Sequence, residues 1–223
     1  MADWQLATPH EYCDPIVGNV LGAIGLVLGL LVVPTVSTTP VARPTKKEAL
    51  LVGDSVMSIL LHTDAALILL EKEHPFLLRS VPCQRLIFEG CKPFAKDSSL
   101  KMLQKNKGKF SNVVVVGTGY NDLDDANFGR AVREITSEAK LQGVQVLWLT
   151  YRQAGNVRMK SVSYNRQLFE LEKKIDNLHI LRWCDLSNGH PEWFTADSVH
   201  LNATGGLALA KAISAAIGQL TST

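Results

Sequence analysis

The 223-residue sequence predicts an α/β domain with a mostly parallel sheet. Two observations lead to this fold class. From Glu48 onward, short apolar runs with the character of strands alternate with longer runs that have the character of helices. The strand-like runs are continuously apolar and rich in β-branched residues, most clearly in Val113–Val116, which is typical of a sheet covered by helices on both faces.

The expected strands and helices follow one another from Ala49 to Leu220. The strands are Ala49–Val52, a weaker one near Leu77–Val81, Asn112–Val116, Val144–Thr150 and His179–Arg182. The helices are Val56–Glu73, Asp125–Leu141, Ser161–Lys174 and Ala203–Leu220. Gly143 lies just past the second helix, where glycine commonly ends a helix, and Asn202 or Thr204 can cap the last one.

The N-terminal segment differs from the rest of the chain. Ile16–Val33 is apolar or glycine except for Asn19, which is close to the roughly 20 residues that cross a bilayer as a helix. A buried core helix is the alternative, and the acidic flank before the stretch disfavours a cleaved signal peptide. We therefore expect an N-terminal tail and transmembrane helix over residues 1–36, a linker over 37–47 and one catalytic domain over 48–223.

The composition gives little support to a role in nucleic-acid binding. The formal net charge is only +2, and the basic residues form no concentrated run with interleaved aromatic residues. A charged fraction of 20% beside a hydrophobic fraction of 46% is ordinary for a globular protein, so we do not expect a disordered chain.

Ser55 is the first candidate functional residue. It follows the first strand through Gly53 and Asp54, so it lies at the carboxyl edge of the sheet, where open α/β folds bind their ligands. Gly53 permits a tight turn, and Asp54 can order that turn through its side chain. The expected helix that follows would favour developing negative charge at its N-terminus. The alternative role for Ser55 is that of a helix N-cap.

Two later segments supply the partners that a nucleophilic serine needs. Asp197 and His200 lie three residues apart before the last helix, so the imidazole can accept the serine proton while the carboxylate fixes its tautomer. Asn121 follows the third strand, and its amide can donate to the oxyanion of an acyl-transfer intermediate. The alternatives are a helix-capping Asp beside a surface His and an ordinary Gly-Asn turn.

These residues together resemble the SGNH (GDSL-type) hydrolase superfamily. The segments Gly53-Asp54-Ser55, Gly119-Tyr120-Asn121-Asp122 and Asp197-Ser198-Val199-His200 match three of its sequence blocks in the required order. The resemblance implies a flavodoxin-like three-layer α/β/α fold, with Ser55 as nucleophile, His200 as base and Asp197 as the residue that orients it. It also implies an oxyanion hole formed by the Ser55 N–H, the Asn121 side chain and a glycine N–H. Gly90, in the loop after the second strand, is the positional candidate for this glycine.

A narrower resemblance concerns the segment from Cys83 to Cys91. It is similar to the paired-cysteine segment of SGNH domains in membrane-linked bacterial proteins, including those fused to integral-membrane acyltransferases. This implies a Cys83–Cys91 disulfide and an exported domain. The basic residues Arg43, Lys46 and Lys47 after the apolar stretch indicate the opposite, a cytoplasmic domain. We expect a membrane-anchored domain on the extracytoplasmic side, on the strength of the resemblance.

The sequence thus predicts a serine esterase or deacetylase that removes O-acyl groups from carbohydrates or other cell-surface molecules and needs no metal or organic cofactor. The alternative is an O-acyltransferase that uses the same residues, in which case Tyr151, Arg152 and Gln153 could contact the acceptor or could simply form a loop. A non-catalytic binding module on a membrane anchor is the third hypothesis.

Overall fold

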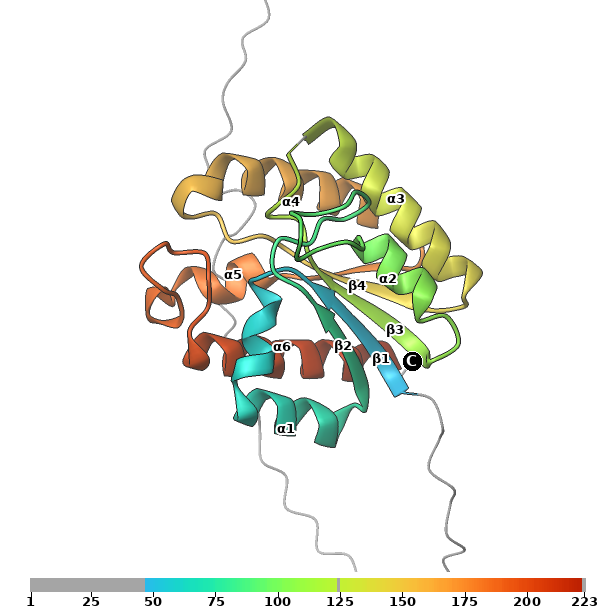
Figure 1. The fold of residues 1–223 in the computed structure, drawn as a ribbon, viewed down its shortest axis with the longest axis horizontal. Coiled ribbons are helices and arrows are strands. Elements are labelled where there is room, and N and C mark those ends of the chain that lie inside the picture. Colours follow the sequence, from blue (N-terminus) through green and yellow to red (C-terminus); the bar gives the residue numbers. More distant parts are fainter. Residues whose placement is uncertain (1–46, 124, 222–223) are drawn as a thin grey trace, which may run out of the picture.

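The computed structural model describes residues 47–123 and 125–221. Its centre is a sheet of five parallel strands in the order β2-β1-β3-β4-β5 (Figure 1). The strands are β1 (Lys47–Gly53), β2 (Phe76–Ser80), β3 (Phe110–Gly117), β4 (Gln145–Leu149) and β5 (Leu178–Leu181). All five predicted strands are confirmed with small shifts at their ends. The strand order is that of the flavodoxin-like fold.

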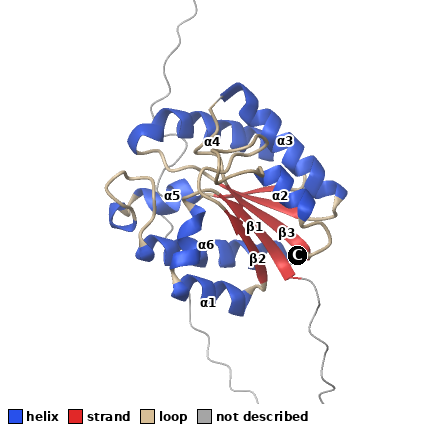
Figure 2. Cartoon of the chain, in the orientation of Figure 1, coloured by secondary structure: helices blue, strands red, loops and turns tan. Residues whose placement is uncertain are grey.

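Helices connect the strands and cover the sheet (Figure 2). The α-helices are α1 (Asp64–Glu73), α2 (Ser99–Lys105), α3 (Asp125–Leu141), α4 (Arg158–Glu172), α5 (Trp183–Asn188) and α6 (Ala203–Thr221). The 3-10 helices are η1 (Met57–His62), η2 (Gly155–Val157) and η3 (Pro191–Trp193). The predicted helix over 125–141 is confirmed at both ends, and those at 161–174 and 203–220 are confirmed with shifted ends.

The predicted continuous helix Val56–Glu73 is wrong. The chain forms η1 and then α1, and between them Thr63 leaves the helical region with φ −131° and ψ 90°. Thr63 is buried where α6 passes, since a Cβ added to Gly206 would lie 3.0 Å from the Thr63 hydroxyl and 3.1 Å from Ile59. The break therefore lies at a point of close packing between two segments.

The core has two halves, one on each face of the sheet. Alternate residues of a buried strand point to opposite faces, so Val113 and Val115 pack with η1, α1 and α6, while Val114 and Val116 pack with α2, α3 and α4. Figure 1 shows α1 and α6 along one side of the sheet and α2, α3 and α4 along the other. The predicted three-layer α/β/α arrangement is confirmed.

The ends of α3 and α6 follow the predicted capping. Gly143 has φ +71° just after α3, and Val144 N–H donates to the carbonyl oxygen of Ala139 at 3.0 Å. At the start of α6 the Asn202 side chain accepts from Gly205 N–H at 3.0 Å.

Cys83 and Cys91 form a disulfide, with their Cα atoms 5.6 Å apart. The expected transmembrane helix within residues 1–36 and nearly all of the expected linker over 37–47 lie outside the described residues; Lys47 already belongs to β1. None of the helices in the described part of the chain has the length and apolar character of a membrane span.

Candidate active site

The turn after β1 holds Ser55 at the carboxyl edge of the sheet. β1 pairs with β2 on one side and β3 on the other, so the turn lies at the topological switch point. Asp54 is fully buried, and its carboxylate accepts from Val56 N–H at 3.0 Å and Gly119 N–H at 3.2 Å. Burial raises the pKa of Asp54 to about 6, although these amide hydrogen bonds oppose the shift. Asp54 thus orders its own turn, as predicted, and joins it to the turn after β3.

The structure brings Ser55, His200 and Asp197 together in one hydrogen-bonded line. Ser55 Oγ lies 2.9 Å from His200 Nε2, and His200 Nδ1 lies 2.5 Å from Asp197 Oδ2. A carboxylate only accepts hydrogen bonds, so Nδ1 carries the imidazole proton and the Nε2 lone pair faces the serine hydroxyl. The serine and the histidine are 145 positions apart in the sequence.

Asp197 is held as an anion by several donors. Its Oδ1 accepts at 2.9 Å from Val199 N–H, His200 N–H and the Thr195 hydroxyl. Partial burial alone would raise the pKa of Asp197, but the hydrogen bonds from His200, from the two amides and from Thr195 together hold it well below its ordinary range. The carboxylate is therefore charged at neutral pH and can stabilise an imidazolium.

Arg152 supports the loop that carries this pair. Its Nε donates to the Ser198 carbonyl oxygen at 3.0 Å, one guanidinium N–H donates to Ser187 O at 2.6 Å, and the group stacks 3.7 Å from the Phe194 ring centroid. Burial lowers the pKa of Arg152. Of the two predicted roles for Arg152, its buried position at 8% exposure favours a structural loop residue over a contact with an acceptor.

Asn121 lies beside Ser55 in the turn after β3. Its side-chain Nδ2 donates to the Gln84 carbonyl oxygen at 3.3 Å, which leaves the second hydrogen of the amide for the cleft. The Asp122 carboxylate accepts from Leu86 N–H at 3.1 Å, so it holds this turn against the loop after β2. Asn121 and Ser55 line the same cleft, so the Asn121 side chain is close to Ser55, as the sequence predicted.

Gly90 lies in the loop after β2, as the sequence placed it, but its N–H is not available for the predicted oxyanion hole. Its N–H donates to the Ala95 carbonyl oxygen at 2.9 Å, and a Cβ at this position would collide with the Cys83 carbonyl oxygen. The amide is therefore used inside the disulfide-closed loop, and Gly90 is not among the residues that line the cleft at Ser55. The physical reason is that the chain turns back between Cys91 and Ala95, so that the Ala95 carbonyl oxygen accepts this N–H inside the loop that the Cys83–Cys91 disulfide closes.

A partly polar cleft of about 450 Å³ opens at Ser55. It is lined by Ser55, Val56, Tyr120, Asn121, Asn156, Val157, Asp197, Val199 and His200. Sequence reasoning did not single out Asn156 and Val157, which come from η2 after β4. Their position at the carboxyl end of a strand is the signal that could have identified them.

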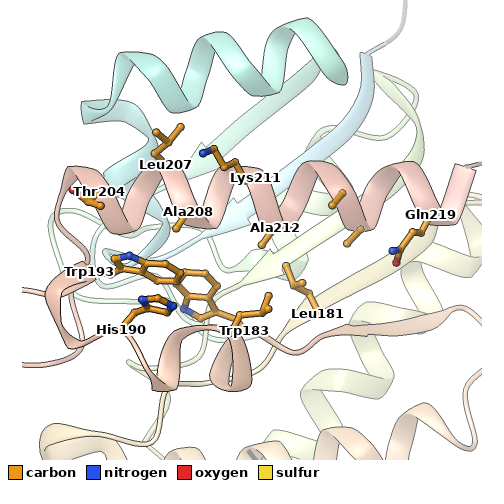
Figure 3. Close-up of a pocket in the computed structure, with 13 residues that line it drawn as sticks. Leu181, Trp183, His190, Trp193, Thr204, Leu207, Ala208, Lys211, Ala212 and Gln219 are labelled. Carbon is orange, nitrogen blue, oxygen red and sulfur yellow. The ribbon is translucent and has the colours of Figure 1, made fainter. Parts of the chain in front are cut away.

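A second hollow of about 700 Å³ lies between α5 and α6. Figure 3 shows Trp193, His190 and Trp183 gathered opposite Ala208 and Ala212 of α6. His190 and Trp193 stack at 3.9 Å between ring centroids. No residue of the predicted triad lines this hollow, so the cleft at Ser55 is the candidate active site.

Comparison with known proteins gives one short sequence match and several structural ones. No protein-family model matches the chain. Over 45 residues the chain is 40% identical to the O-acetyltransferase OatA of Staphylococcus aureus. The aligned segment covers 20% of this chain and 8% of that protein. The chain therefore spans only a small part of the length of the curated relatives that it matches.

The structural matches extend over most of the described domain. The chain is similar to the C-terminal catalytic domain of the peptidoglycan O-acetyltransferase OatA from Streptococcus pneumoniae, with a TM-score of 0.59 and 18% identity over 80% of this chain and 96% of that one. It is also similar to a GDSL-like lipase from Bacteroides thetaiotaomicron, with a TM-score of 0.59 and 13% identity over 80% of this chain and 92% of that one. The fold is that of the SGNH (GDSL-type) hydrolases.

Proposed function

We propose that this chain is a serine esterase that hydrolyses O-acyl esters through Ser55, His200 and Asp197. The observation that carries the proposal is the row of hydrogen bonds from Asp197 through His200 to Ser55, which lies in a partly polar cleft. The SGNH fold supports it, because Ser55 lies at the switch point of the sheet.

The geometry supports a two-step reaction. The Ser55 oxygen attacks the acyl carbonyl carbon while His200 Nε2 accepts the hydroxyl proton. The tetrahedral intermediate then collapses, and His200 returns the proton to the departing alcohol as the acyl-enzyme forms. In the second step His200 removes a proton from water, the water oxygen attacks the acyl carbon, and the free acid and the Ser55 hydroxyl are released.

Two donors near Ser55 are suited to the oxyanion. One is the free hydrogen of Asn121 Nδ2, and the other is the Ser55 N–H. Removal of one such donor typically costs about 3 kcal/mol of transition-state stabilisation. Gly90 has no part in this proposal, since its N–H donates within its own loop.

The proposed substrate is an O-acyl group on a carbohydrate or another cell-surface molecule. The cleft is partly polar, with Asn156 and Asn121 in its walls, which suits an alcohol portion rich in hydroxyl groups. The structurally similar OatA domain, described as a peptidoglycan O-acetyltransferase, favours the same substrate class.

An O-acyltransferase is the second candidate function. The 40% identity to the Staphylococcus aureus O-acetyltransferase over 45 residues favours it, and the same triad serves both reactions when a sugar hydroxyl replaces water. Incubation with an acyl donor and glycan fragments separates the two. Acylated glycan as the main product identifies a transferase, whereas free acid alone identifies a hydrolase.

The proposal includes a membrane anchor at Ile16–Val33 and a domain on the extracytoplasmic side. The apolar stretch and the Cys83–Cys91 disulfide support it, because disulfides persist mainly in oxidising compartments. Protease added to intact cells should digest the domain. Complete protection of the domain until the cells are lysed would place it in the cytoplasm.

Hydrolysis of a short acyl ester by the wild type and by Ser55→Ala tests the catalytic proposal. We expect the substitution to lower kcat by at least about a thousandfold while the protein remains folded. Equal turnover by the two proteins would remove the proposal.

A further inference from the structure

Two basic side chains hold the turn that carries Asn121. Lys160 Nζ donates to the carbonyl oxygens of Tyr120 at 2.6 Å and Asp122 at 3.0 Å. Arg85 Nε donates to the carbonyl oxygen of Asn121 at 3.0 Å. Three consecutive carbonyl groups thus accept hydrogen bonds from cations on two separate segments, the loop after β2 and helix α4.

These contacts fix the direction of the Asn121 side chain. Hydrogen bonds from a charged donor are roughly twice as strong as neutral ones, and both cations are half-buried, so solvent competes with them only in part. Neither peptide plane next to Asn121 can rotate without breaking one of the bonds. The Cα–Cβ bond of Asn121 therefore keeps one direction relative to Ser55.

The loop after β2 also orients the amide itself. Asn121 Nδ2 donates to the carbonyl oxygen of Gln84, the residue directly before Arg85. One short segment thus binds both the backbone and the side chain of Asn121. Asp122 completes the arrangement, because its carboxylate accepts from Leu86 N–H in the same segment.

We propose that Lys160 and Arg85 are positioning residues that act through Asn121 by holding its side-chain amide toward the carbonyl oxygen of a bound ester. This inference rests on the proposed esterase function. It adds two residues that do not line the cleft and that lie outside the three sequence blocks of the predicted catalytic residues.

A kinetic double-mutant cycle on a soluble short-chain ester tests the inference in the full chain. Lys160→Met removes the donor and keeps an apolar stem. We expect kcat to fall about tenfold while KM stays within about twofold, since the interaction acts on the oxyanion and not on ground-state binding. In an Asn121→Ala background the same substitution should leave kcat unchanged, and Lys160→Arg should restore most of the wild-type kcat.

Arg85→Met gives a second cycle with the same expectation, so the test does not depend on the folding of one variant. Lys101→Met, on the exposed side of α2, is the matched control and should leave kcat unchanged. Equal losses of kcat with and without the Asn121 side chain, or no loss in either variant, would overturn the inference. Wild-type turnover equal to that of Ser55→Ala would instead remove the proposed function.

Discussion

Three carboxylates lie at or near the candidate active site, and the two buried ones have a different role from the exposed one. Asp197 lies at the surface and orients His200, whereas Asp54 and Asp122 are buried and accept backbone N–H groups that join the turns after β1, β2 and β3. Burial raises the pKa of both internal acids to about 6. Their contribution to the free energy of unfolding therefore depends on pH.

For Asp122, burial raises the pKa from 3.8 to about 6, against the opposing hydrogen bond from Leu86 and the charges of Arg85 and Lys160. The folded protein thus holds this proton more tightly than the unfolded chain does. The contribution of Asp122 to the free energy of unfolding is fully present at a pH below the pKa of this group in the unfolded chain. It is lost as the pH rises through the pKa of the group in the folded protein, and the total loss is about 3 kcal/mol.

Asp122→Asn cannot titrate and keeps an acceptor for Leu86 N–H. We expect its unfolding free energy, relative to the wild type, to rise by about 2.5 kcal/mol between about pH 4 and about pH 7.5, as measured by urea denaturation. Asp176→Asn, at an exposed position, is the control. A difference between wild type and Asp122→Asn that is the same at both pH values would contradict this account.

At the scale of elements, the loop after β4 packs against the loop that carries Asp197. Gly155 in η2 has φ +58°, and a Cβ there would lie 2.6 Å from the Asp197 carbonyl oxygen. Only glycine satisfies both the backbone angle and the close approach. η2 therefore helps to place the carboxylate that orients His200.

Gly155→Ala should lower kcat about tenfold or more, because a displacement of the Asp197 loop misaligns His200 with Ser55. Gly143→Ala is a matched control, since Gly143 has φ +71° but has no neighbouring atom within 4 Å of the added Cβ. Both variants should lose about 1 kcal/mol of stability from backbone strain. Equal kcat values for the two variants would show that the contact does not position the loop.

At the scale of the whole molecule, the sheet separates two cores, and Tyr120, just beyond the end of β3, packs against both of them. Val114 and Val115 are neighbours in β3, both fully buried, and belong to different cores. The three-layer arrangement predicts that each side chain is stabilised by its own set of helices.

Val114→Ala and Val115→Ala should each cost about 2 kcal/mol of unfolding free energy, and the double variant should show the sum within about 0.5 kcal/mol. Leu141→Ala, at a side chain that is 79% exposed, should change stability by less than about 0.5 kcal/mol. Chemical denaturation of the four variants provides the comparison. Strong coupling between the two valines would argue against separate cores.

The strands and the residues that meet at the cleft were predictable because their signals are local. β3 contains a continuous β-branched run, and Ser55, Asn121 and His200 each lie in a short motif just after a strand or before a helix. α2 and α5 are 7 and 6 residues long, too short to show a helical period, and they were missed.

The supporting residues could not be predicted because their partners are distant backbone groups. Arg85, Lys160 and Arg152 reach carbonyl oxygens that are 36, 40 and 46 positions away. A carbonyl group has no residue-type signature, so no sequence pattern marks these contacts. The same holds for Gly90, whose amide direction depends on the fold of a loop closed by a disulfide.

Covalent labelling of the folded full chain by a fluorophosphonate probe, followed by peptide mass spectrometry, tests the central claim most directly. A serine reacts with such a probe only when a base and an oxyanion site activate it. We predict a single adduct on Ser55, none in Ser55→Ala, and strongly slowed labelling in His200→Ala. A folded wild-type protein that stays unlabelled, or that is labelled equally well without the His200 imidazole, would contradict the account.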